Sequence, residues 1–434
     1  MTDFSFPSAA LSLMRRLEEY NFQAWIVGGA VRDSILGLPI HDVDIASQAK
    51  PEEIKAIFED VKTIDVGISF GTVRVLWEDA IFELTTFRAD GDYEDGRHPT
   101  EVFYSDRIED DLKRRDFTIN AMAWNPSRGL LDLFGGRVDL EDGLIRAVGC
   151  AEDRIGEDAL RMLRAVRFAA RFGFQLEETL MQAILNRKKG LEKVSVERSF
   201  IEMDQILCHR RASDGIRLLE ETGLLTVLLP ELSWKTVSDR ERTGRLLSLL
   251  PADSSLRWAA LFRYLTDETI DAVRLARESL DKLKSSRLLR DEVSLLLACR
   301  LPDQKPDLYA VKRLMAETGP SFDKLVCFLE ADRISRDRED EEVVKVIQSY
   351  GQKIRDERLA IRTGDLAING KDLLEIGYNQ GRDLGRTLEE LLEQVMRGKL
   401  ANTREELLDY AGLRKESGQR IVNKQSREVS RGVK

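Results

Sequence analysis

The sequence WIVGGAVRD at residues 25–33, followed by HDVDI at residues 41–45, is the stretch that decides the fold of this chain. Residues 24–27 predict a short buried strand, and the glycine pair after it gives a backbone that can approach a phosphate closely where a helix begins. Arg32 lies at the opening of that predicted helix, where a triphosphate is the natural ligand. The order of strand, glycine turn, helix and second strand indicates a site for a phosphorylated substrate.

Two carboxylates alternate in the second segment. A strand through residues 42–45 would direct the side chains of Asp42 and Asp44 to the same face, roughly 6.5 to 7 Å apart. Two such groups can hold divalent metal ions that stabilise the attacking and leaving oxygens of an in-line phosphoryl displacement. Glu83, in the strand-like run 81–87 of a predicted hairpin, is a candidate third carboxylate, and the alternative is a strand charge that faces solvent. Each motif alone is common, but their order together indicates metal-assisted nucleotidyl transfer.

The composition is that of a globular protein of about three domains, with 434 residues of which 42% are hydrophobic and 33% are charged. The net charge of −10 argues against indiscriminate binding of nucleic acid, so any RNA contact must use local basic patches. The start of the chain lacks a signal-peptide pattern and no apolar run reaches membrane-spanning length, which predicts a cytoplasmic protein with no membrane partner. Cys150, Cys208, Cys299 and Cys327 are widely spaced and predict buried thiols, not a zinc site or disulfides.

Two later segments add polar groups to this site. In residues 111–123, Asp116 is predicted to be the N-cap of an apolar helix, and Arg115 can reach the phosphates. Residues 157–171 have the period of a single amphipathic helix. A ribbon of polar side chains recurs along one face of that helix, formed by Asp158, Arg161, Arg164 and Arg167.

Asp158 and Arg161 suit the pairing edges of two bases. Cytosine and adenine present an amine beside an acceptor nitrogen, which matches an accepting carboxylate and a donating guanidinium. With guanine or uracil, the acceptor of the protein would face an acceptor of the base and the donor would face a donor. Each buried group left unpaired in this way costs about 1–3 kcal/mol of binding free energy. The alternative is a solvated helix with Asp–Arg ion pairs. The ribbon therefore predicts that the protein selects C and A without a template.

These motifs resemble those of the class II tRNA nucleotidyltransferases, the CCA-adding enzymes of the polymerase-β-like nucleotidyltransferase superfamily. The resemblance covers the Gly-Gly and Asp-x-Asp motifs, residues 114–121 and residues 157–161, and it implies that Asp42 and Asp44 bind Mg²⁺. Residues 195–202 are similar to the family motif that braces the ribbon helix. The resemblance also implies an incoming ATP or CTP in contact with Gly29, Arg32 and Arg115 at its phosphates and with Asp158, Arg161, Arg164 and Arg167 elsewhere in the pocket.

The same resemblance implies an α+β fold. It consists of an N-terminal polymerase-β-like nucleotidyltransferase head with a mixed β-sheet, followed by an all-helical neck, body and tail. The expected domains are the head at 1–150, the neck with nucleotide-selecting helices at 151–213, the helical body at 214–360, the tRNA-holding tail at 361–413 and a basic, largely disordered extension at 414–434.

Family enzymes add C, C and A to tRNA 3′ ends and release pyrophosphate. The resemblance thus implies a CCA tRNA nucleotidyltransferase that contacts the acceptor stem and elbow of tRNA. Family variants that add only CC have a shortened loop where this chain keeps a charged, glycine-rich loop at residues 88–99, which favours complete CCA addition. An A-adding specialist of the family is the second hypothesis and a poly(A) polymerase the third.

Two hypotheses of other classes are less well supported by the sequence. A histidine-rich phosphohydrolase site is not indicated, because the chain has only 3 histidines. A non-catalytic RNA-binding module would require the metal carboxylates to be vestigial. The sequence does not determine the oligomeric state.

Overall fold

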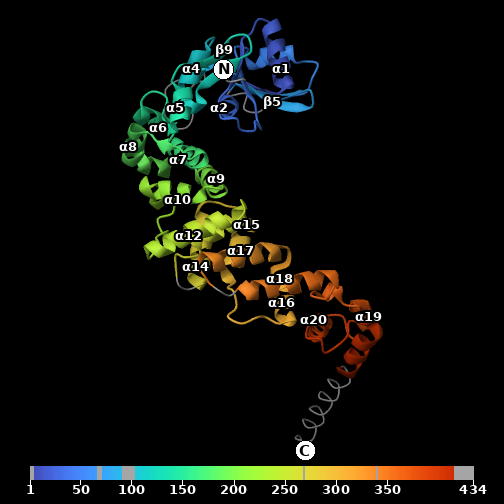
Figure 1. Ribbon diagram of the computed structural model, residues 1–434. Coiled ribbons are helices and arrows are strands. Elements are labelled where there is room, and N and C mark those ends of the chain that lie inside the picture. The colour runs from blue at the N-terminus through green and yellow to red at the C-terminus, as the bar shows by residue number, and fades with distance from the viewer. Residues whose placement is uncertain (1–3, 66–70, 90–102, 267–268, 339–340, 415–434) are drawn as a thin grey trace, which may run out of the picture. The chain divides into compact units, whose positions relative to one another are not determined.

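The structure, a computed structural model, describes residues 4–65, 71–89, 103–266, 269–338 and 341–414 (Figure 1). The chain separates into two compact units, Met1–Arg290 and Asp291–Lys434. The division falls inside the body expected at 214–360, so that range contributes to both units. Except for Arg88, Ala89 and Arg414, the predicted loop at 88–99 and the predicted extension at 414–434 lie outside the described residues.

The first unit begins with a mixed sheet of seven strands in the order β3-β4-β5-β2-β1-β8-β9. Strand β2 runs parallel to β5, and all other neighbours in this sheet are antiparallel. This sheet confirms the predicted α+β head. The strands of the sheet are β1 (Ala24–Val27), β2 (Asp44–Ser47), β3 (Thr63–Asp65), β4 (Thr72–Trp77), β5 (Ala80–Thr86), β8 (Met122–Asn125) and β9 (Gly129–Asp132). Two small sheets pair β6 (Arg88–Ala89) with β7 (Phe103–Tyr104) and β10 (Leu144–Ile145) with β11 (Gln175–Leu176).

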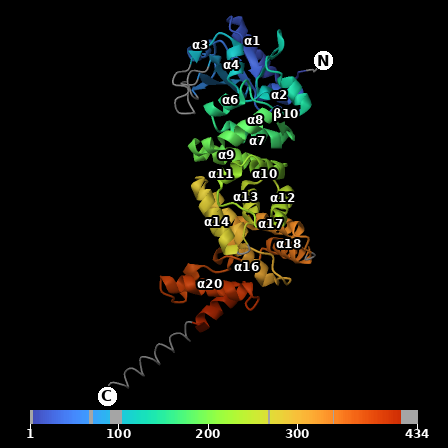
Figure 2. The ribbon, with the colours of Figure 1, turned by 90° about the vertical axis from the view of Figure 1, so that its left-hand side faces the viewer.

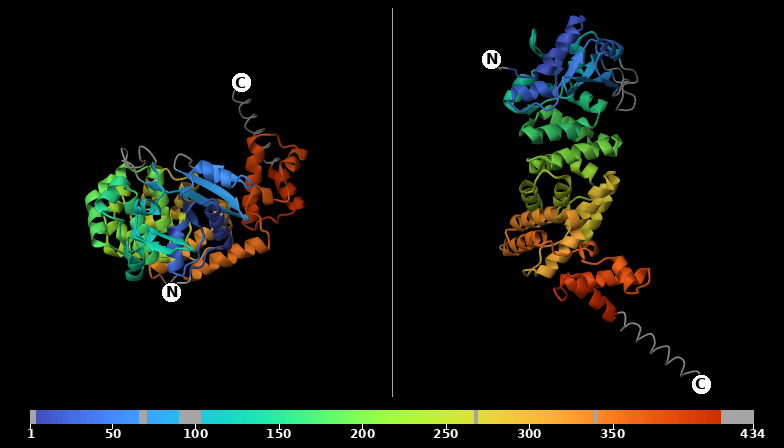
Figure 3. Two further views of the ribbon diagram at one scale, coloured as in Figure 1. Left: turned by 90° about the horizontal axis from the view of Figure 1, so that it is seen from above. Right: turned by 90° about the vertical axis from the view of Figure 1, so that its right-hand side faces the viewer.

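Helices cover the seven-stranded sheet. In α1 the apolar positions Ala10, Leu13, Met14 and Leu17 recur at helical spacing and are buried, so this helix packs beside the sheet, as the deep-blue helix of Figure 3 shows. All four residues of β1 are buried, which confirms the strand predicted at 24–27. The head helices are α1 (Ser8–Glu19), α2 (Gly29–Ile35), α3 (Pro51–Ile57), α4 (Ile108–Lys113), the 3-10 turn η2 (Thr118–Asn120) and α5 (Gly136–Asp142).

The apolar helix predicted within residues 111–123 is wrong. Residues 118–120 form only a 3-10 turn, and the chain then enters β8, which lies between β1 and β9. Pairing with a strand nearly a hundred residues earlier overrides the local helical pattern, because the exposed edge of β1 needs a partner for its backbone groups. Asp116 is therefore not a helix N-cap; its Oδ1 accepts from the backbone N–H of Phe117 at 2.8 Å.

The rest of the first unit is helical, and α7, α9 and α10 lie against one another (Figure 2). Helix α7 buries Met162, Leu163 and Val166 on its apolar face and ends at Gly173, whose φ of +75° is left-handed. These helices are α6 (Ala151–Glu157), α7 (Arg161–Phe172), α8 (Glu178–Arg187), the 3-10 helix η3 (Lys188–Lys193), α9 (Val196–Leu207), α10 (Ala212–Glu221), α11 (Leu224–Leu228), α12 (Val237–Leu249), α13 (Ser254–Phe262) and α14 (Thr269–Lys282). Helix α15 (Arg287–Ala298) spans the division between the units.

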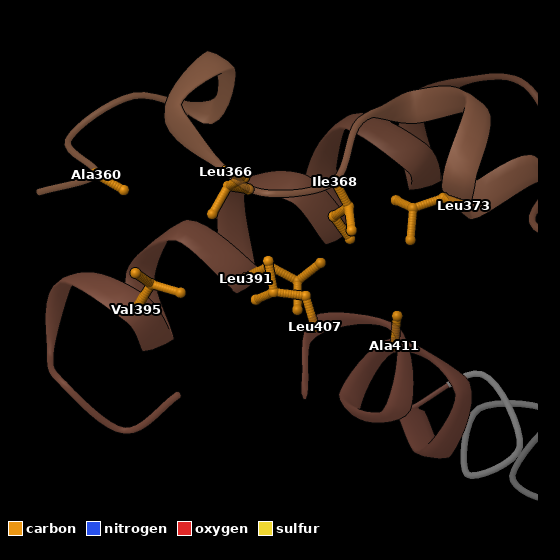
Figure 4. Close-up of a cluster of buried hydrophobic side chains, with 8 residues drawn as sticks. All are labelled: Ala360, Leu366, Ile368, Leu373, Leu391, Val395, Leu407 and Ala411. Carbon is orange, nitrogen blue, oxygen red and sulfur yellow. The ribbon is translucent and has the colours of Figure 1, made fainter. Parts of the chain in front are cut away.

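The second unit has its own apolar core. Leu373, Leu391 and Leu407 from three successive helices converge with Leu366, which follows η5 (Thr363–Asp365), and all four are buried (Figure 4). Burial of such side chains gives each about 1.5–3 kcal/mol of stabilisation. The elements are α16 (Leu308–Thr318), η4 (Gly319–Ser321), α17 (Phe322–Ser335), α18 (Glu341–Asp356), η5 (Thr363–Asp365), α19 (Gly370–Glu375), α20 (Arg382–Met396) and a helix at 404–414.

The sequence also made predictions about membrane-spanning segments and about the cysteines. Over the part of the chain that the structure describes, no helix combines the length and apolar composition that a membrane crossing requires. The four cysteines, all of which the structure describes, form no disulfides, but they are not buried as predicted: Cys150 is exposed and the other three are half-buried.

Candidate active site

One cavity of about 850 Å³ lies in the first unit, between the sheet of the head and helices α7 and α9. Its walls are formed by strand ends, the start of α2 and polar side chains of the two helices. It brings together every site residue that the sequence predicts, namely Gly29, Arg32, Asp42, Asp44, Glu83, Arg115, Asp158, Arg161, Arg164 and Arg167.

The glycine turn between β1 and α2 forms part of the cavity wall. Gly28 has a φ of +69°, which side-chain-bearing residues rarely adopt, and its N–H donates to the carbonyl of Met122 at 3.1 Å. A Cβ atom on Gly28 would lie 2.6 Å from Nη1 of Arg115. Glycine is therefore required here both by the backbone conformation and by the close approach of the arginine.

Arg32 is buried and fixed on several sides. Its Nε donates to Asp33 at 2.8 Å and its Nη1 to Oδ1 of Asn120 at 2.6 Å. The guanidinium also lies over the rings of Phe168 and Phe172, at 5.3 and 4.9 Å from their centres. Burial lowers the pKa of Arg32, against the opposing effect of Asp33. The aromatic side of α7 thus helps to hold a guanidinium of the head at the cavity wall.

The two aspartates lie at the start of β2. This strand begins at Asp44 and not at Asp42 as predicted, because its pairing with β1 ends where Val27 is opposite Asp44 and the chain then turns at the glycines. The alternation nevertheless holds, since Val43 is buried while Asp42 and Asp44 are accessible and line the cavity. The sequence thus anticipated the direction of the two side chains but not the limit of the strand.

Glu83 is the neighbour of Asp44 in the parallel pair of β2 and β5. On its other side, Arg74 of β4 donates to Glu83 Oε1 from Nε at 2.7 Å and from Nη2 at 2.5 Å. Burial raises the pKa of Asp44, Arg115 opposes this effect, and the charges of Glu83 and Asp42 add to it. A divalent cation bound between neighbouring carboxylates would relieve their mutual repulsion, and Mg²⁺ prefers oxygen ligands of this kind. Among the described residues, however, no group of three histidine, cysteine, aspartate or glutamate side chains is arranged to hold a metal ion. Glu83 forms an ion pair with Arg74 instead.

Arg115 is held by groups that the sequence reasoning did not identify. Its Nη2 donates to Oδ2 of Asp111 at 3.1 Å and its Nη1 to the carbonyl of Asn120 at 3.3 Å. Asp111 is inaccessible to solvent and also binds Arg114, at 2.7 Å. Burial by itself raises the pKa of Asp111, but the two guanidinium groups outweigh it and bring that pKa below its ordinary value. An acidic residue three and four positions before two arginines on a helix is the sequence signal that could have identified this anchor.

The single helix predicted at 157–171 is interrupted. Helix α6 ends at Glu157 and α7 begins at Arg161, with Asp158 in an extended conformation between them. Oδ1 of Asp158 accepts from the backbone N–H of Leu160 at 3.0 Å, which stabilises the start of α7. Its Oδ2 accepts from Nη2 of Arg198 on α9 at 2.7 Å. Asp158 is therefore placed beside the ribbon of α7 rather than on it.

The three arginines of the ribbon are each bound to another element or to the preceding helix. Arg161 contacts Glu157 and donates to the carbonyls of Arg154 at 2.8 Å and Arg114 at 3.2 Å. These bonds tie the first turn of α7 to α6 and to the end of α4.

The other two arginines of the ribbon face carboxylates. Arg164 pairs with Asp116 at 2.6 Å, and Arg167 pairs with Glu202 of α9 at 2.6 Å. Asp116 raises the pKa of Arg164, whereas burial lowers that of Arg167. The ribbon is thus a braced wall of the cavity and not a solvated helix face.

The comparisons with known proteins agree with this architecture. The family model described as the poly A polymerase head domain matches residues 24–146, one for an RNA- and SrmB-binding site of polymerase A matches 173–235, and one for a second domain of tRNA nucleotidyltransferases matches 251–411. The CCA-adding enzyme of Geobacillus thermodenitrificans is 38% identical over 410 residues, which cover 94% of this chain and 96% of the relative. The CCA-adding enzyme of Streptococcus thermophilus is 35% identical over 414 residues, with 92% and 95% covered. The chain belongs to the family of CCA-adding enzymes.

A solved structure of this family has the same fold. The Bacillus stearothermophilus CCA-adding enzyme in complex with CTP superposes with a TM-score of 0.77 at 32% identity, covering 95% of this chain and 98% of that one. Membership of the CCA-adding family confirms the resemblance read from the sequence and the prediction of a nucleotidyltransferase. The individual roles of the cavity residues remain predictions.

Proposed function

We propose that this chain is a template-independent CCA-adding tRNA nucleotidyltransferase, which adds C, C and A to tRNA 3′ ends from CTP and ATP and releases pyrophosphate. The proposal rests on one cavity. Its lining includes the accessible aspartates Asp42 and Asp44, arginines of α2 and α7, and Asp158 near the start of α7. Nucleotidyl transfer needs these three functions together: activation of the 3′ hydroxyl, a hold on the triphosphate and recognition of the base.

Asp42 and Asp44 are the proposed ligands of Mg²⁺, and Glu83 is a candidate third carboxylate. When bound, the metal ions would stabilise the attacking and leaving oxygens of the displacement at the α-phosphate. Burial is the main cause of the raised pKa of Asp44, and the negative charges of Glu83 and Asp42 add to it, a condition that a bound cation would relieve. The ion pair to Arg74 makes Glu83 the weakest member of the set.

Gly29, Arg32 and Arg115 are proposed to bind the triphosphate. Gly29 opens α2, where free backbone N–H groups suit an anion. The buried Nε of Arg115 has no hydrogen-bond partner within the described chain, so the guanidinium keeps a donor for a ligand. Arg32 supplies a second positive charge whose position is fixed by Asp33 and Asn120.

Asp158 and Arg161 are proposed to read the base. The Leu160 N–H and Arg198 use acceptor sites on both oxygens of Asp158. Because a carboxylate has about four acceptor sites, one remains for the amine of cytosine or adenine. Arg164 and Arg167 complete the proposed nucleotide pocket, with their positions set by carboxylates on other elements.

The proposed partners are the tRNA acceptor stem and elbow together with CTP and ATP. One relative of solved structure, the Thermotoga maritima CCA-adding enzyme with tRNA, is similar at 25% identity and a TM-score of 0.60. The domain limits at 150, 213, 360 and 413, with a tail that holds tRNA, belong to the proposal, as does a cytoplasmic location, where tRNA and both nucleotides are available. An A-adding specialist of the same family is the second candidate. The retained sequence Arg97-His98-Pro99 argues against an enzyme that adds only CC.

The test supplies purified protein and Mg²⁺ with tRNA transcripts that end at the discriminator base, after C, or after CC. Each transcript receives CTP, ATP or both, and the products are sequenced. Addition of CCA to the shortest transcript is the expected result. Growth of the CC-ended transcript alone, by one A, would identify an A-adding specialist, and long adenosine tails would identify a poly(A) polymerase.

A further inference from the structure

Helix α9 carries polar side chains on two opposite sides. Arg198 and Glu202, four residues apart, face the cavity, where they bind Asp158 and Arg167. Asp204 follows Glu202 by two residues, which is about 200° around a helix, so its side chain leaves α9 on the side away from the cavity. Helix α9 lies between α7 and α13 (Figure 2), and this second side packs against α13.

Asp204 is bound to two side chains of α13. Its Oδ1 accepts from Nε1 of Trp258 at 2.8 Å and from Oγ of Ser254, the first residue of that helix. The start of a helix carries a partial positive charge, which favours a carboxylate there. Both donors are neutral groups, so the position of α9 is fixed here by the direction of two hydrogen bonds.

Aromatic rings continue this contact between the two helices. Phe200, one turn before Asp204 on α9, stacks on the indole of Trp258, with ring centres 5.7 Å apart and planes inclined by 11°. Stacked apolar rings can slide past each other, because the hydrophobic effect has no preferred direction. The hydrogen bond from the indole N–H to Asp204 removes that freedom. Phe200 and Asp204 together therefore fix the rotation of α9 and its position along its own axis relative to α13.

Helix α13 is suited to serve as the fixed reference. All of its residues from Ser255 to Phe262 are buried. Asp253 caps the start of the helix by accepting from the backbone N–H of Leu256 at 3.1 Å. Arg257 donates to the carbonyl of Pro251 at 2.8 Å, which ties the helix to the chain before it.

The contact that α9 makes with the proposed base reader has little tolerance. Nη2 of Arg198 lies 2.7 Å from Oδ2 of Asp158. A helix with its side chains has a radius of about 5–6 Å, so a rotation of α9 by about 10° would move such a group by about 1 Å. A displacement of that size would take the two atoms beyond hydrogen-bond distance.

We infer that Asp204 is a positioning residue for the selection of the base. By holding α9 on α13, it places the guanidinium of Arg198 where it orients the carboxylate of Asp158 toward the incoming nucleotide. The same hold sets the position of Glu202, which binds Arg167. The inference rests on the proposed function and adds to it a determinant of specificity that lies outside the nucleotide cavity.

The first experiment measures the Kd of the full chain for CTP and for UTP by equilibrium dialysis in the presence of Mg²⁺. Asp204→Leu removes the acceptor of both hydrogen bonds, whereas Asp204→Asn keeps an oxygen at the position of Oδ1. Residues that touch no ligand change the coupling to a site by amounts that correspond to about 2- to 30-fold in affinity. The preference for CTP over UTP is expected to fall by that factor in Asp204→Leu and to stay close to the natural value in Asp204→Asn.

The second experiment repeats the measurement with Trp258→Phe, which removes the indole N–H but keeps an aromatic ring for Phe200. The matched control is Trp234→Phe. Trp234 also donates from Nε1 to a side-chain oxygen, that of Thr243 at 2.9 Å, but it does so away from α9. Trp258→Phe is expected to lose preference for CTP in the same direction as Asp204→Leu, and Trp234→Phe is expected to keep it.

Thermal unfolding establishes which variants are folded, and Trp258→Phe decides if Asp204→Leu is not. An equal loss of affinity for CTP and UTP in the folded variants would overturn the inference, because it would assign Asp204 a role in stability alone. A loss of preference as large in Trp234→Phe as in Trp258→Phe would overturn it too. Equal binding of CTP and UTP by the natural protein would instead refute the proposed base reader, and this inference with it. Since dialysis uses no tRNA, these outcomes are distinguishable from a failure to add CCA.

Discussion

Replacement of Asp158 by Asn is the sharpest perturbation of the proposed base reader, because it exchanges an acceptor for a donor without a change of shape. Oδ1 of Asp158 accepts from the Leu160 N–H at 3.0 Å, so the amide oxygen of asparagine is expected to take that position. The amide NH₂ then lies where Oδ2 accepts from Arg198 at 2.7 Å, and two donors face each other. Arg198 must withdraw, and the NH₂ becomes available to the cavity.

The expected size follows from these contacts. A hydrogen bond to a charged group contributes about 1.5–3 kcal/mol, which is about 10- to 150-fold in rate. We therefore expect kcat/KM for CTP to fall by about that factor, since the amine of cytosine loses its acceptor. The new NH₂ can donate to the carbonyl of uracil, so the preference for CTP over UTP should fall by a larger factor still.

The assay measures single-nucleotide addition of CTP and UTP to a tRNA transcript that ends at the discriminator base. Asp60→Asn is the matched control: Asp60 is also paired with an arginine of the same unit, Arg16 at 2.9 Å, but it does not line the cavity. Thermal unfolding of both variants establishes that each is folded. An unchanged CTP-to-UTP preference in a folded Asp158→Asn protein would refute the role of Asp158 in reading the base.

Three further predictions test other parts of the site. Asp44→Asn should abolish Mn²⁺ binding measured by EPR and lower incorporation about a thousandfold or more, whereas Glu83→Gln should have a smaller effect because its carboxylate is already ion-paired; equal losses would contradict this order. Gly28→Ala should lower the free energy of unfolding by about 1–3 kcal/mol and weaken CTP binding, because the methyl group displaces Arg115; unchanged CTP affinity in equilibrium dialysis would refute the contact. The pKa of Asp111 is depressed in the folded state, so the stabilisation from its carboxylate is present above the unfolded pKa of about 3.9 and is lost as the pH falls through the folded pKa. Below about pH 4, the Tm of Asp111→Asn should therefore fall less steeply with pH than that of the natural protein. Parallel Tm profiles would be inconsistent with this prediction.

The sequence pattern predicted the structure of segments whose conformation depends mainly on neighbouring residues. The strand at 24–27, the turn at Gly28 and the amphipathic run of α7 were all predicted, because burial, a positive φ and helical spacing are properties of neighbouring residues. The predicted site residues line one cavity, although Asp42, Arg115 and Asp158 lie outside the helices and strands that were predicted to place them.

The sequence pattern predicted the wrong structure where contacts with residues distant in the chain override the local preference. Residues 111–123 were predicted to contain an apolar helix, yet the chain forms β8 from Met122 because β1 offers it hydrogen bonds. The run 157–171 reads as one helix, but Asp158 leaves the helical conformation to accept from Leu160 and from Arg198, forty residues later. Asn120 belongs to the motif at 114–121 but was given no role from the sequence, although its side chain helps to fix Arg32.

The sequence by itself determined the family, the head fold and which residues line the site, because glycine turns, alternating carboxylates and a helical ribbon are written in spacings of a few residues. Only the tertiary structure decided how these groups are held: Asp111 binds Arg115, and Glu202 of α9 binds Arg167. The physical reason is that a charged side chain in a partly buried place takes its orientation from whichever opposite charge the fold brings near it, and the chain separation of that partner is not fixed by any local period.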